Sequence, residues 1–390
     1  MIRHPILLII ILLLIEITVL SVSAHPRFKK YFNFLPAIFW IYFLPMVVST
    51  FGVIDAKSPI YQKLTTNLLP ASLFLLLMAV DVKAILQLGK TALTMFIAGM
   101  LGIMIGGVTV FFIFKRWVGE EFWAGFGVLT ASWTGGSANM IAAKEALGVS
   151  DQIFLPMVIV DTIVPYTWMG VLVGLAGMQA HYDRWNHSNR HVIDELKDRL
   201  SHASQEKVDT MNLTTTCLIL ALAAAGSFAA QFFAQFFPVI KDAISTYTWT
   251  IILVSVAGLV LSLTPMRNVK QYGSNRIGYF LLYFVLTTIG AKASLANIGS
   301  TLILIVAGFL IVIIHTIVLV CVSRWIKAPM FLVATSTQAN IGGVASAPIV
   351  AEIYQPGFAS VGLLLAIFGN IVGTYVGIMT AQICRFLTAF

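Results

Sequence analysis

Charged residues are scarce in this 390-residue chain, where Asp, Glu, Lys and Arg together make up only 10% of the sequence. Soluble domains carry about 25% charged residues, so this composition excludes a soluble globular protein. The hydrophobic fraction is 59%, the mean hydropathy is +0.92, and apolar runs recur along the whole sequence. The chain is therefore predicted to be an all-α, multi-pass protein of the lipid bilayer, with no separate soluble domain.

Cysteine is also rare, and the three cysteines lie in apolar stretches, which argues against a disulfide framework or a thiolate metal site,. The sequence has no P-loop, which argues against an ATP-driven pump. It also lacks paired catalytic carboxylates, a Ser/His arrangement and a His-rich motif within its apolar segments, so no enzyme and no cofactor are predicted. The net charge of +8 comes without a nucleic-acid recognition motif,. It indicates cationic loops of a bacterial inner-membrane protein.

What the chain does have is an internal repeat at a constant offset of 209 residues. The stretch AVDVKAIL (79–86) recurs as TIGAKASL (288–295), and the same offset places Asp161 on Asn370. Duplication in so apolar a chain is typical of secondary transporters built from two related halves. Because the halves of such proteins meet at the substrate site, the repeat also indicates where that site lies.

The repeat divides the chain into a first transmembrane repeat at 1–180, a hydrophilic connector at 181–211 and a second transmembrane repeat at 212–390. The mixed charges of the connector predict a cytoplasmic loop or short amphipathic helix. Hydropathy predicts six apolar segments per half. They lie near 5–24, 36–54, 65–80, 91–114, 122–147 and 153–179, and near 212–237, 246–264, 275–290, 300–322, 328–354 and 358–384.

Two segments, 127–149 and 332–354, are interrupted by a Gly-Gly pair and are rich in Ser, Thr, Asn and Gln. A bilayer tolerates broken backbone only where the freed amides and carbonyls are buried in protein or line a cavity. Close helix packing through small residues is the alternative, but the matching positions in both halves favour a binding site. If both segments turn back, the chain crosses ten times and the halves are inverted. If both cross, twelve crossings and parallel halves result.

Asp161 is the sharpest functional candidate, because an unpaired carboxylate within an apolar span costs roughly 3 kcal/mol on insertion scales. Such a group can bind and release H⁺ or Na⁺. Pro165 has no N–H, so the carbonyl oxygen of Asp161 is free of its helical hydrogen bond and available to a cation,. The alternative is a protonated Asp161 hydrogen-bonded across a helix interface.

The interrupted segments offer hard oxygen ligands for Na⁺, and their helix N-termini attract an anionic group. No other metal is predicted. His315 also lies in an apolar segment, but a hydrogen bond to neighbouring backbone is the simpler interpretation, so it stays outside the site. The predicted ion-binding residues are Asp161, Asn370, Thr134, Asn139 and Gln338. The predicted solute-binding residues are Ser137, Gly135, Gly136, Asn340, Gly342, Gly343 and Ser346.

The stretches AVDVKAIL, WTGGSANM and NIGG resemble the bacterial membrane family catalogued as domain of unknown function 819, and the resemblance covers nearly the whole chain. That family is similar to the cation:proton antiporter and anion transporter group, which includes bile-acid, glutamate and citrate sodium symporters. The resemblance implies an inverted-repeat fold with a scaffold and a mobile core, often a homodimer, that moves as an elevator. In antiporters of that group a carboxylate on the helix after the first broken helix carries the ion. Asp161 has that placement, although it is the single acidic residue there.

The sequence therefore predicts an ion-coupled secondary transporter, driven by Na⁺ or H⁺, for a small anionic organic solute. One alternative is a cation/proton antiporter that uses Asp161 alone. An alternative of another class is a passive channel, which would need no buried carboxylate. The sequence leaves the solute, the coupling ion and the direction of transport open.

Overall fold

The computed structural model of the chain describes residues 1–28, 31–32, 37–189, 191–193, 195–196, 212–239, 245–292 and 301–389. These residues are almost entirely helical, and their one β-type pairing is an isolated bridge between Ile2 and Ile54. All twelve predicted apolar segments coincide with helices. The chain divides into two compact units. Unit 1 is formed by Met1–Val80, Glu145–Val158 and Lys207–Ser300, and unit 2 by Asp81–Lys144, Ile159–Glu206 and Thr301–Phe390.

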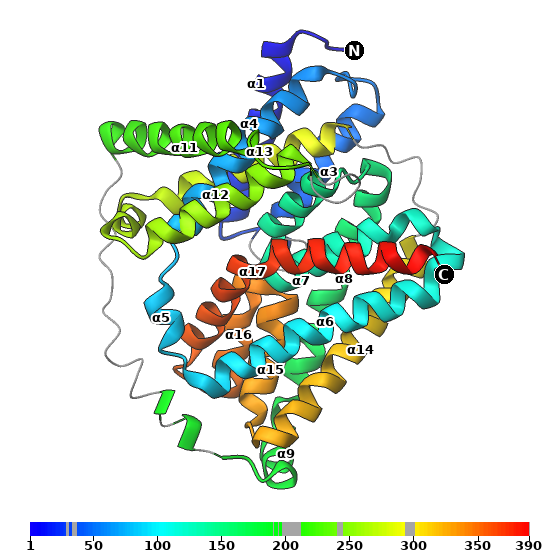
Figure 1. Ribbon diagram of the computed structural model, residues 1–390, viewed down its shortest axis with the longest axis vertical. Coiled ribbons are helices and arrows are strands. Elements are labelled where there is room, and N and C mark those ends of the chain that lie inside the picture. The colour runs from blue at the N-terminus through cyan, green and yellow to red at the C-terminus, as the bar shows by residue number, and fades with distance from the viewer. Residues whose placement is uncertain are drawn as a thin grey trace. The chain divides into compact units, whose positions relative to one another are not determined.

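The described residues of unit 1 form six long helices, among which α13 packs against α3 and α4, while α11 and α12 pack against α4 (Figure 1). Two of them begin with a proline in the first turn, where its missing N–H costs nothing,. Two others begin with capping boxes formed by Asn212 with Thr215 and by Ser245 with Thr248,. The six are α1 (Pro5–Ala24), α3 (Ala37–Thr50), α4 (Pro59–Met78), α11 (Leu213–Ala234), α12 (Thr246–Ser262) and α13 (Ser274–Lys292).

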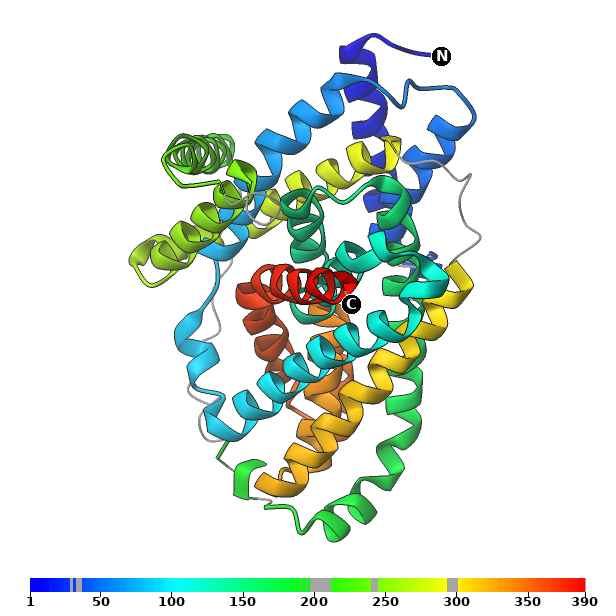
Figure 2. The same ribbon diagram turned by 45° about the vertical axis from the view of Figure 1, so that its right-hand side comes forward.

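Unit 2 contains the two interrupted segments and the pair α6 and α14, which run side by side (Figure 2). Gly102 and Gly106 of α6 allow this close approach, because a Cβ at either position would meet α14 backbone within 3.0–3.1 Å. The helices are α5 (Val82–Leu86), α6 (Gly89–Val118), α7 (Trp123–Leu147), α8 (Asp151–Leu175), α9 (Gln179–Asn186), α14 (Thr301–Ile326), α15 (Met330–Ile341), α16 (Gly343–Tyr354) and α17 (Ala359–Phe386). The ends of α7 and α8 that face each other in the sequence belong to unit 1.

Within the described residues, six helices are long and apolar enough to cross a membrane. A run of about twenty apolar residues meets that requirement. The predicted class, an all-α polytopic membrane protein, is confirmed. Of the predicted connector, α9 and a few following residues are described, and most of 190–211 lies outside the described residues. The six candidate spans are Pro5–Ala24, Gly89–Val118, Asp151–Asn186, Leu213–Ala234, Thr301–Ile326 and Ala359–Phe386.

Candidate functional site

The second interrupted segment folds into a helical hairpin, in which α15 runs along α17 in the same direction. At the start of both helices, the rings of Phe331 and Phe358 lie 5.4 Å apart. Further along, Asn340 donates a hydrogen bond to the carbonyl of Phe96 (3.2 Å), whose ring lies 5.4 Å from that of Phe368. Later residues of α15 therefore lie near later residues of α17, with Phe96 of α6 between Asn340 and Phe368.

The other arm, α16, runs in the opposite direction. Gly362 near the start of α17 packs directly on the backbone of Ala347, and residues 355–358 alone separate α16 from α17. The chain turns at Gly342-Gly343, where Gly343 has a φ of +62°. Gln338 donates a hydrogen bond to Ser346 across this turn (2.7 Å), and both side chains lie where a Cβ of Gly342 would be. Glycine is therefore required at the tip.

The base of this hairpin is fixed by α8 and α9. Asp183 accepts a hydrogen bond from the backbone N–H of Met330 (2.9 Å), at the N-terminus of α15, where a negative charge is favourable. Asn186 donates to the carbonyl of Ala328 (2.7 Å). On the other arm, the hydroxyl of Tyr354 donates to the carbonyl of Leu172 (2.7 Å).

The first interrupted segment, α7, is broken at Gly136, whose φ of 75° and ψ of −178° are not helical. Before the break, α7 runs antiparallel to α17. A Cβ on Gly127 would lie 2.4 Å from the Cβ of Ala381, and a Cβ on Gly373 would lie 2.6 Å from the Cα of Gly135. Small residues at four-residue spacing thus bring the two backbones into direct contact.

After Gly136 the chain must turn back, because α8 begins only four positions after α7 ends and runs in the same direction as the first arm of α7. Asp161 of α8 lies beside Trp133. Later in α8, Leu172 reaches the base of the α15–α16 hairpin. The two hairpins therefore come in from opposite ends of unit 2. Their tips share Phe96 as a neighbour, since a Cβ on Gly369 would lie 3.0 Å from its ring and 2.0 Å from the carbonyl oxygen of Thr134.

Asn139 organises the first tip and brings several predicted residues together. Its amide nitrogen donates to the carbonyls of Gly135 (2.6 Å) and Asn370 (3.3 Å). Its amide oxygen accepts hydrogen bonds from the backbone N–H (2.7 Å) and the hydroxyl (2.5 Å) of Thr374. The side-chain oxygen of Asn370 would lie 3.7 Å from a Cβ on Gly136, so it faces the break in α7.

Asp161 of α8 contacts a different part of α7 from Asn370 of α17. The residue is partly exposed, and its carboxyl group interacts with the side chains of Ser132 and Trp133, which precede the break. The repeat thus pairs Asp161 with Asn370 in sequence, whereas in space each contacts its own section of α7.

Three predicted ligand oxygens lie near the tips without a hydrogen-bond donor in the described part of the chain. They are the Oγ1 of Thr134, the Oε1 of Gln338 and the Oδ1 of Asn340, and all three residues are buried. A buried oxygen without a partner costs about 1–3 kcal/mol. In a native site such groups call for an explanation, of which a bound ion is one.

The predicted solute residues divide by exposure. Gly136, Ser137, Gly342 and Gly343, at the two breaks, are partly exposed. By contrast Gly135, Asn340 and Ser346 are buried. Of the predicted solute residues, the partly exposed group is the accessible one, and each break also begins a helical arm, whose first N–H groups have no carbonyl partner within that arm.

Comparison with known proteins gives the chain a family. Residues 12–387 match the family described as protein of unknown function (DUF819). The chain belongs to this family. It is also 23% identical over 354 residues to the uncharacterized membrane protein YjcL of Bacillus subtilis (strain 168), which covers 85% of this chain and 86% of that protein. Together with the six apolar helices, these matches make this family member a multi-pass membrane protein.

His315 is a further polar residue of this unit that sequence reasoning placed outside the site. Its Nδ1 is hydrogen-bonded to the carbonyl of Gly99 (2.8 Å), which confirms the predicted bond to neighbouring backbone. Its Nε2 also meets the hydroxyl of Thr337 (2.7 Å), which in turn accepts from the indole N–H of Trp168 (3.2 Å). The sequence gives no signal for these two partners, nor for Thr374, because none of them is close to its partner in the chain. No group of three or more His, Cys, Asp and Glu suited to a metal ion occurs among the described residues.

Proposed function

We propose that this protein is a secondary transporter that couples the movement of a small anionic organic solute to Na⁺ or H⁺. The main support for this proposal is a pair of helical hairpins, α7 and α15–α16. They enter unit 2 from opposite ends, and each turns at a tip that contains glycine. Broken helices in corresponding positions of two related halves are characteristic of transporter binding sites. The opposite directions of the hairpins also support inverted halves and ten crossings.

The ion site consists of Asp161 and the oxygen ligands of the tips. Asp161 supplies the one negative charge, and Pro165 leaves its carbonyl oxygen without a helical donor. The unpartnered oxygens of Thr134 and Gln338 supply neutral hard ligands. Asn139 and Asn370 complete the ion-binding set.

The solute binds at the exposed faces of the two breaks, which is why its charge is expected to be negative. Ser137 and the glycines Gly135, Gly136, Gly342 and Gly343 allow an anionic group to approach backbone N–H groups at the start of a helical arm. Asn340 and Ser346 are buried next to the Gly342-Gly343 turn and support the second tip from its inner side.

The division into two compact units supports an elevator mechanism. In that proposal unit 2, which holds both hairpins, is the mobile core, and unit 1 is the scaffold, which would also hold a homodimer together in the bilayer. A solute site that lies wholly within one compact unit can move with it as a rigid body.

The decisive experiment compares thermal unfolding of the purified protein in Na⁺ and in matched K⁺ across pH, for the wild type and Asp161→Asn. An ion that binds only the folded state adds about 2.7 kcal/mol when its concentration is 100 times the dissociation constant. We expect a Na⁺-specific rise in Tm in the wild type that is absent from Asp161→Asn. Glu121→Gln, which removes an exposed carboxylate of unit 2, should retain the rise.

A rise that depends on pH but not on Na⁺, and again only with Asp161 present, would assign the coupling ion as H⁺. Equal behaviour of the wild type and Asp161→Asn under every condition would disprove the ion site. The second candidate function, cation/proton exchange by Asp161 alone, is favoured by its position beside Ser132 and Trp133. Vesicles loaded with a pH-sensitive dye separate the two, because exchange acidifies or alkalises the lumen on addition of Na⁺ without any solute.

A further inference from the structure

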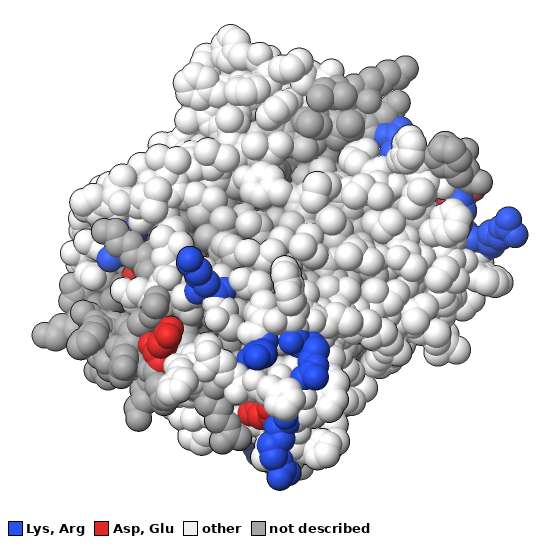
Figure 3. All heavy atoms as spheres, turned by 60° about the horizontal axis from the view of Figure 1, so that its bottom comes forward, with Lys and Arg blue, Asp and Glu red and all other residues white. Residues whose placement is uncertain are grey.

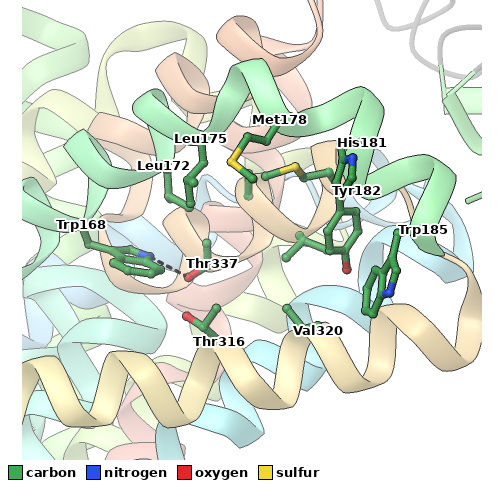
Figure 4. Close-up of a pocket in the computed structure, with 13 residues that line it drawn as sticks. Trp168, Leu172, Leu175, Met178, His181, Tyr182, Trp185, Thr316, Val320 and Thr337 are labelled. Atoms are coloured by element: carbon green, nitrogen blue, oxygen red, sulfur yellow. Dashed lines mark hydrogen bonds between the residues drawn. The ribbon is translucent and has the colours of Figure 1, made fainter.

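Unit 2 contains a pocket of about 430 Å³ that is separate from the hairpin tips (Figure 4). Its walls come from α8, α9, α14 and the first two turns of α15. The α15 residues that line it, Met330 to Thr337, lie at the base of the hairpin, whereas the tip is at Gly342-Gly343. A volume of this size is typical of a site for one small ligand, roughly 300–1,000 Å³.

The inner walls of this pocket, away from His181 and Trp185, have almost no hydrogen-bonding capacity to offer a ligand. The indole N–H of Trp168 is bonded to Thr337, whose hydroxyl meets His315. The hydroxyl of Thr316 donates to the carbonyl of its own helix, and that of Tyr182 donates to Ser323. The remaining inner lining is aliphatic, as Leu172, Val320 and Ala334 illustrate. Because the polar groups of this inner part are already hydrogen-bonded, it selects a hydrocarbon chain.

The pocket follows the helical run from α8 to α9. On the continuous helical run from α8 to α9, the lining begins at Trp168 and ends at Trp185, a distance of about 25 Å at 1.5 Å per residue. The run has 36 residues, of which a bilayer core needs about 20. The end formed by α9 carries His181, Tyr182 and Trp185, residues of the type that gather at the membrane surface,.

A positive charge marks this outer end. The guanidinium of Arg324 lies 4.9 Å from the ring centre of Trp185 and donates to its carbonyl (2.6 Å). Arg184 and Lys327 are also exposed on α9 and after α14. Blue Lys and Arg side chains predominate over red ones on the face shown in Figure 3. An apolar pocket with a cationic rim is complementary to a lipid with an anionic headgroup.

We propose that this pocket binds one acyl chain of an anionic membrane phospholipid, with the phosphate at the Arg324 rim. The inference is independent of transport, because it uses none of the residues assigned to the ion or the solute. Each methylene group that enters the pocket moves from the apolar interior of the bilayer into another apolar environment. The hydrophobic gain between two apolar environments is small, so the rim charge selects the lipid and the pocket fixes its position.

The test uses protein reconstituted in vesicles of phosphatidylethanolamine and phosphatidylglycerol that contain a trace of phosphatidylglycerol with a diazirine at the end of one acyl chain. After illumination, labelled peptides are identified by mass spectrometry. We expect labelling concentrated on the peptides that contain Trp168–Met178 and Met330–Thr337. Ala334→Phe, which fills the pocket and leaves no room for the chain, should abolish most of this labelling. Ile317→Phe, on the exposed face of α14, should leave it unchanged.

The rim is tested by Arg324→Gln. The matched control is Arg385→Gln, because Arg385 stacks on Trp123 in the same manner, in the last turn of α17 and away from the pocket. Only Arg324→Gln should lower labelling by the phosphatidylglycerol probe. Should Ala334→Phe fail to fold, Val320→Phe fills the same pocket from α14. Undiminished labelling of the pocket peptides in the filled variant would overturn the proposal. The proposal would also be overturned if a diazirine fatty acid labelled the same peptides and excess phosphatidylglycerol did not displace it.

Discussion

Asn139 shows how much of the first tip depends on one neutral side chain. It is 4% exposed and bonds to the carbonyl of Gly135 before the break in α7, and to Asn370 and Thr374 on α17. An amide can serve all these partners at once, because it donates from its nitrogen and accepts at its oxygen. A carboxylate could not donate to the carbonyls of Gly135 and Asn370.

Replacing Asn139 with Ala should therefore destabilise the protein more than replacing Thr374 with Val. The first change leaves a buried backbone N–H and hydroxyl of Thr374 unpaired, at about 1–3 kcal/mol for each group. The second removes only the hydroxyl hydrogen bond, worth about 1 kcal/mol. Thermal unfolding in one detergent measures both. A Tm loss for Thr374→Val that equals that of Asn139→Ala would contradict this ranking.

The direction of the hydrogen bonds around His315 follows from its partners. A carbonyl only accepts, so the Nδ1 of His315 carries a proton and donates to Gly99. In the neutral ring the Nε2 then accepts from Thr337, which leaves the oxygen of Thr337 to accept from Trp168. The chain of donors is complete with an uncharged imidazole.

Thr337→Val should break this chain at two places, because the indole N–H of Trp168 and the Nε2 of His315 both lose their partner. Thr316→Val is the matched control, because Thr316 also lines the pocket but bonds only to Val312 on its own helix. We expect a clear fall in Tm for Thr337→Val and a change of about 1 kcal/mol or less for Thr316→Val. Similar Tm values for the two variants would refute the network as a source of stability.

Among single residues, the sequence could identify those that are unusual for a bilayer, such as Asp161, the paired glycines and the tip amides. It could not identify their partners. Thr374, Ser132 and Phe96 are ordinary residues in apolar helices, and their importance comes from contacts with residues far away in the chain.

At the level of helices, the contact between α7 and α17 depends on glycine. A Cβ at Gly369 would lie 2.0 Å from the carbonyl of Thr134, and a Cβ at Gly377 would lie 2.4 Å from the Cβ of Ala131. Both positions face backbone or a Cβ atom, neither of which can move aside as a long side chain can. The small residues at four-residue spacing are therefore a structural requirement.

Gly369→Ala should separate the two helices and lower the Tm, whereas Gly174→Ala should not. Gly174 lies in exposed helix with nothing within 4 Å of its Cβ position. There the change should be neutral or stabilising by up to about 1 kcal/mol, through helix propensity. Differential scanning fluorimetry of the two variants decides the matter. If the Tm of Gly369→Ala is no lower than that of Gly174→Ala, the close packing of α7 and α17 does not contribute to stability.

Hydropathy was sufficient to predict the helices, since the twelve apolar segments agree with helix bounds to within a few residues, apart from the earlier start of α4 at Pro59. The reversal at the two breaks was not predictable, because a Gly-Gly pair permits both a kink and a turn. What distinguishes them is the long-range contact of Phe331 with Phe358 and the short link from α7 to α8.

At the scale of the whole molecule, the prediction concerns the two ends of unit 2, from which the two hairpins come in. In the ten-crossing proposal these two ends lie on opposite sides of the membrane. Ser188 bonds to the carbonyl of Ala328 at the base of the second hairpin (3.2 Å). Thr388 follows Leu387, whose carbonyl accepts from Lys115 at the far end of α17 (2.8 Å). The repeat boundaries at 1–180 and 212–390 stay a prediction, since the compact units divide the chain differently.

Single cysteines at Ser188 and Thr388, in a variant without the natural cysteines, should therefore react with a membrane-impermeant thiol reagent from opposite sides of the membrane. The connector side, with Ser188, is expected to be cytoplasmic. Labelling in intact cells and in inverted vesicles measures this. Two cysteines that react from the same side would instead support twelve crossings and parallel halves.

The α15–α16 hairpin is held very unevenly along its length. Its base is anchored on both arms, by Asp183 and Asn186 to one and by Leu172 to the other, while a bond between Gln338 and Ser346 ties the tip to itself. In mechanical terms it is a lever, clamped at its base and braced near its tip by the bond between Asn340 and Phe96 of α6. In the proposed transporter, a load that the solute applies at the tip would be transmitted to α6, α8 and α9, and through α9 to the connector at 181–211.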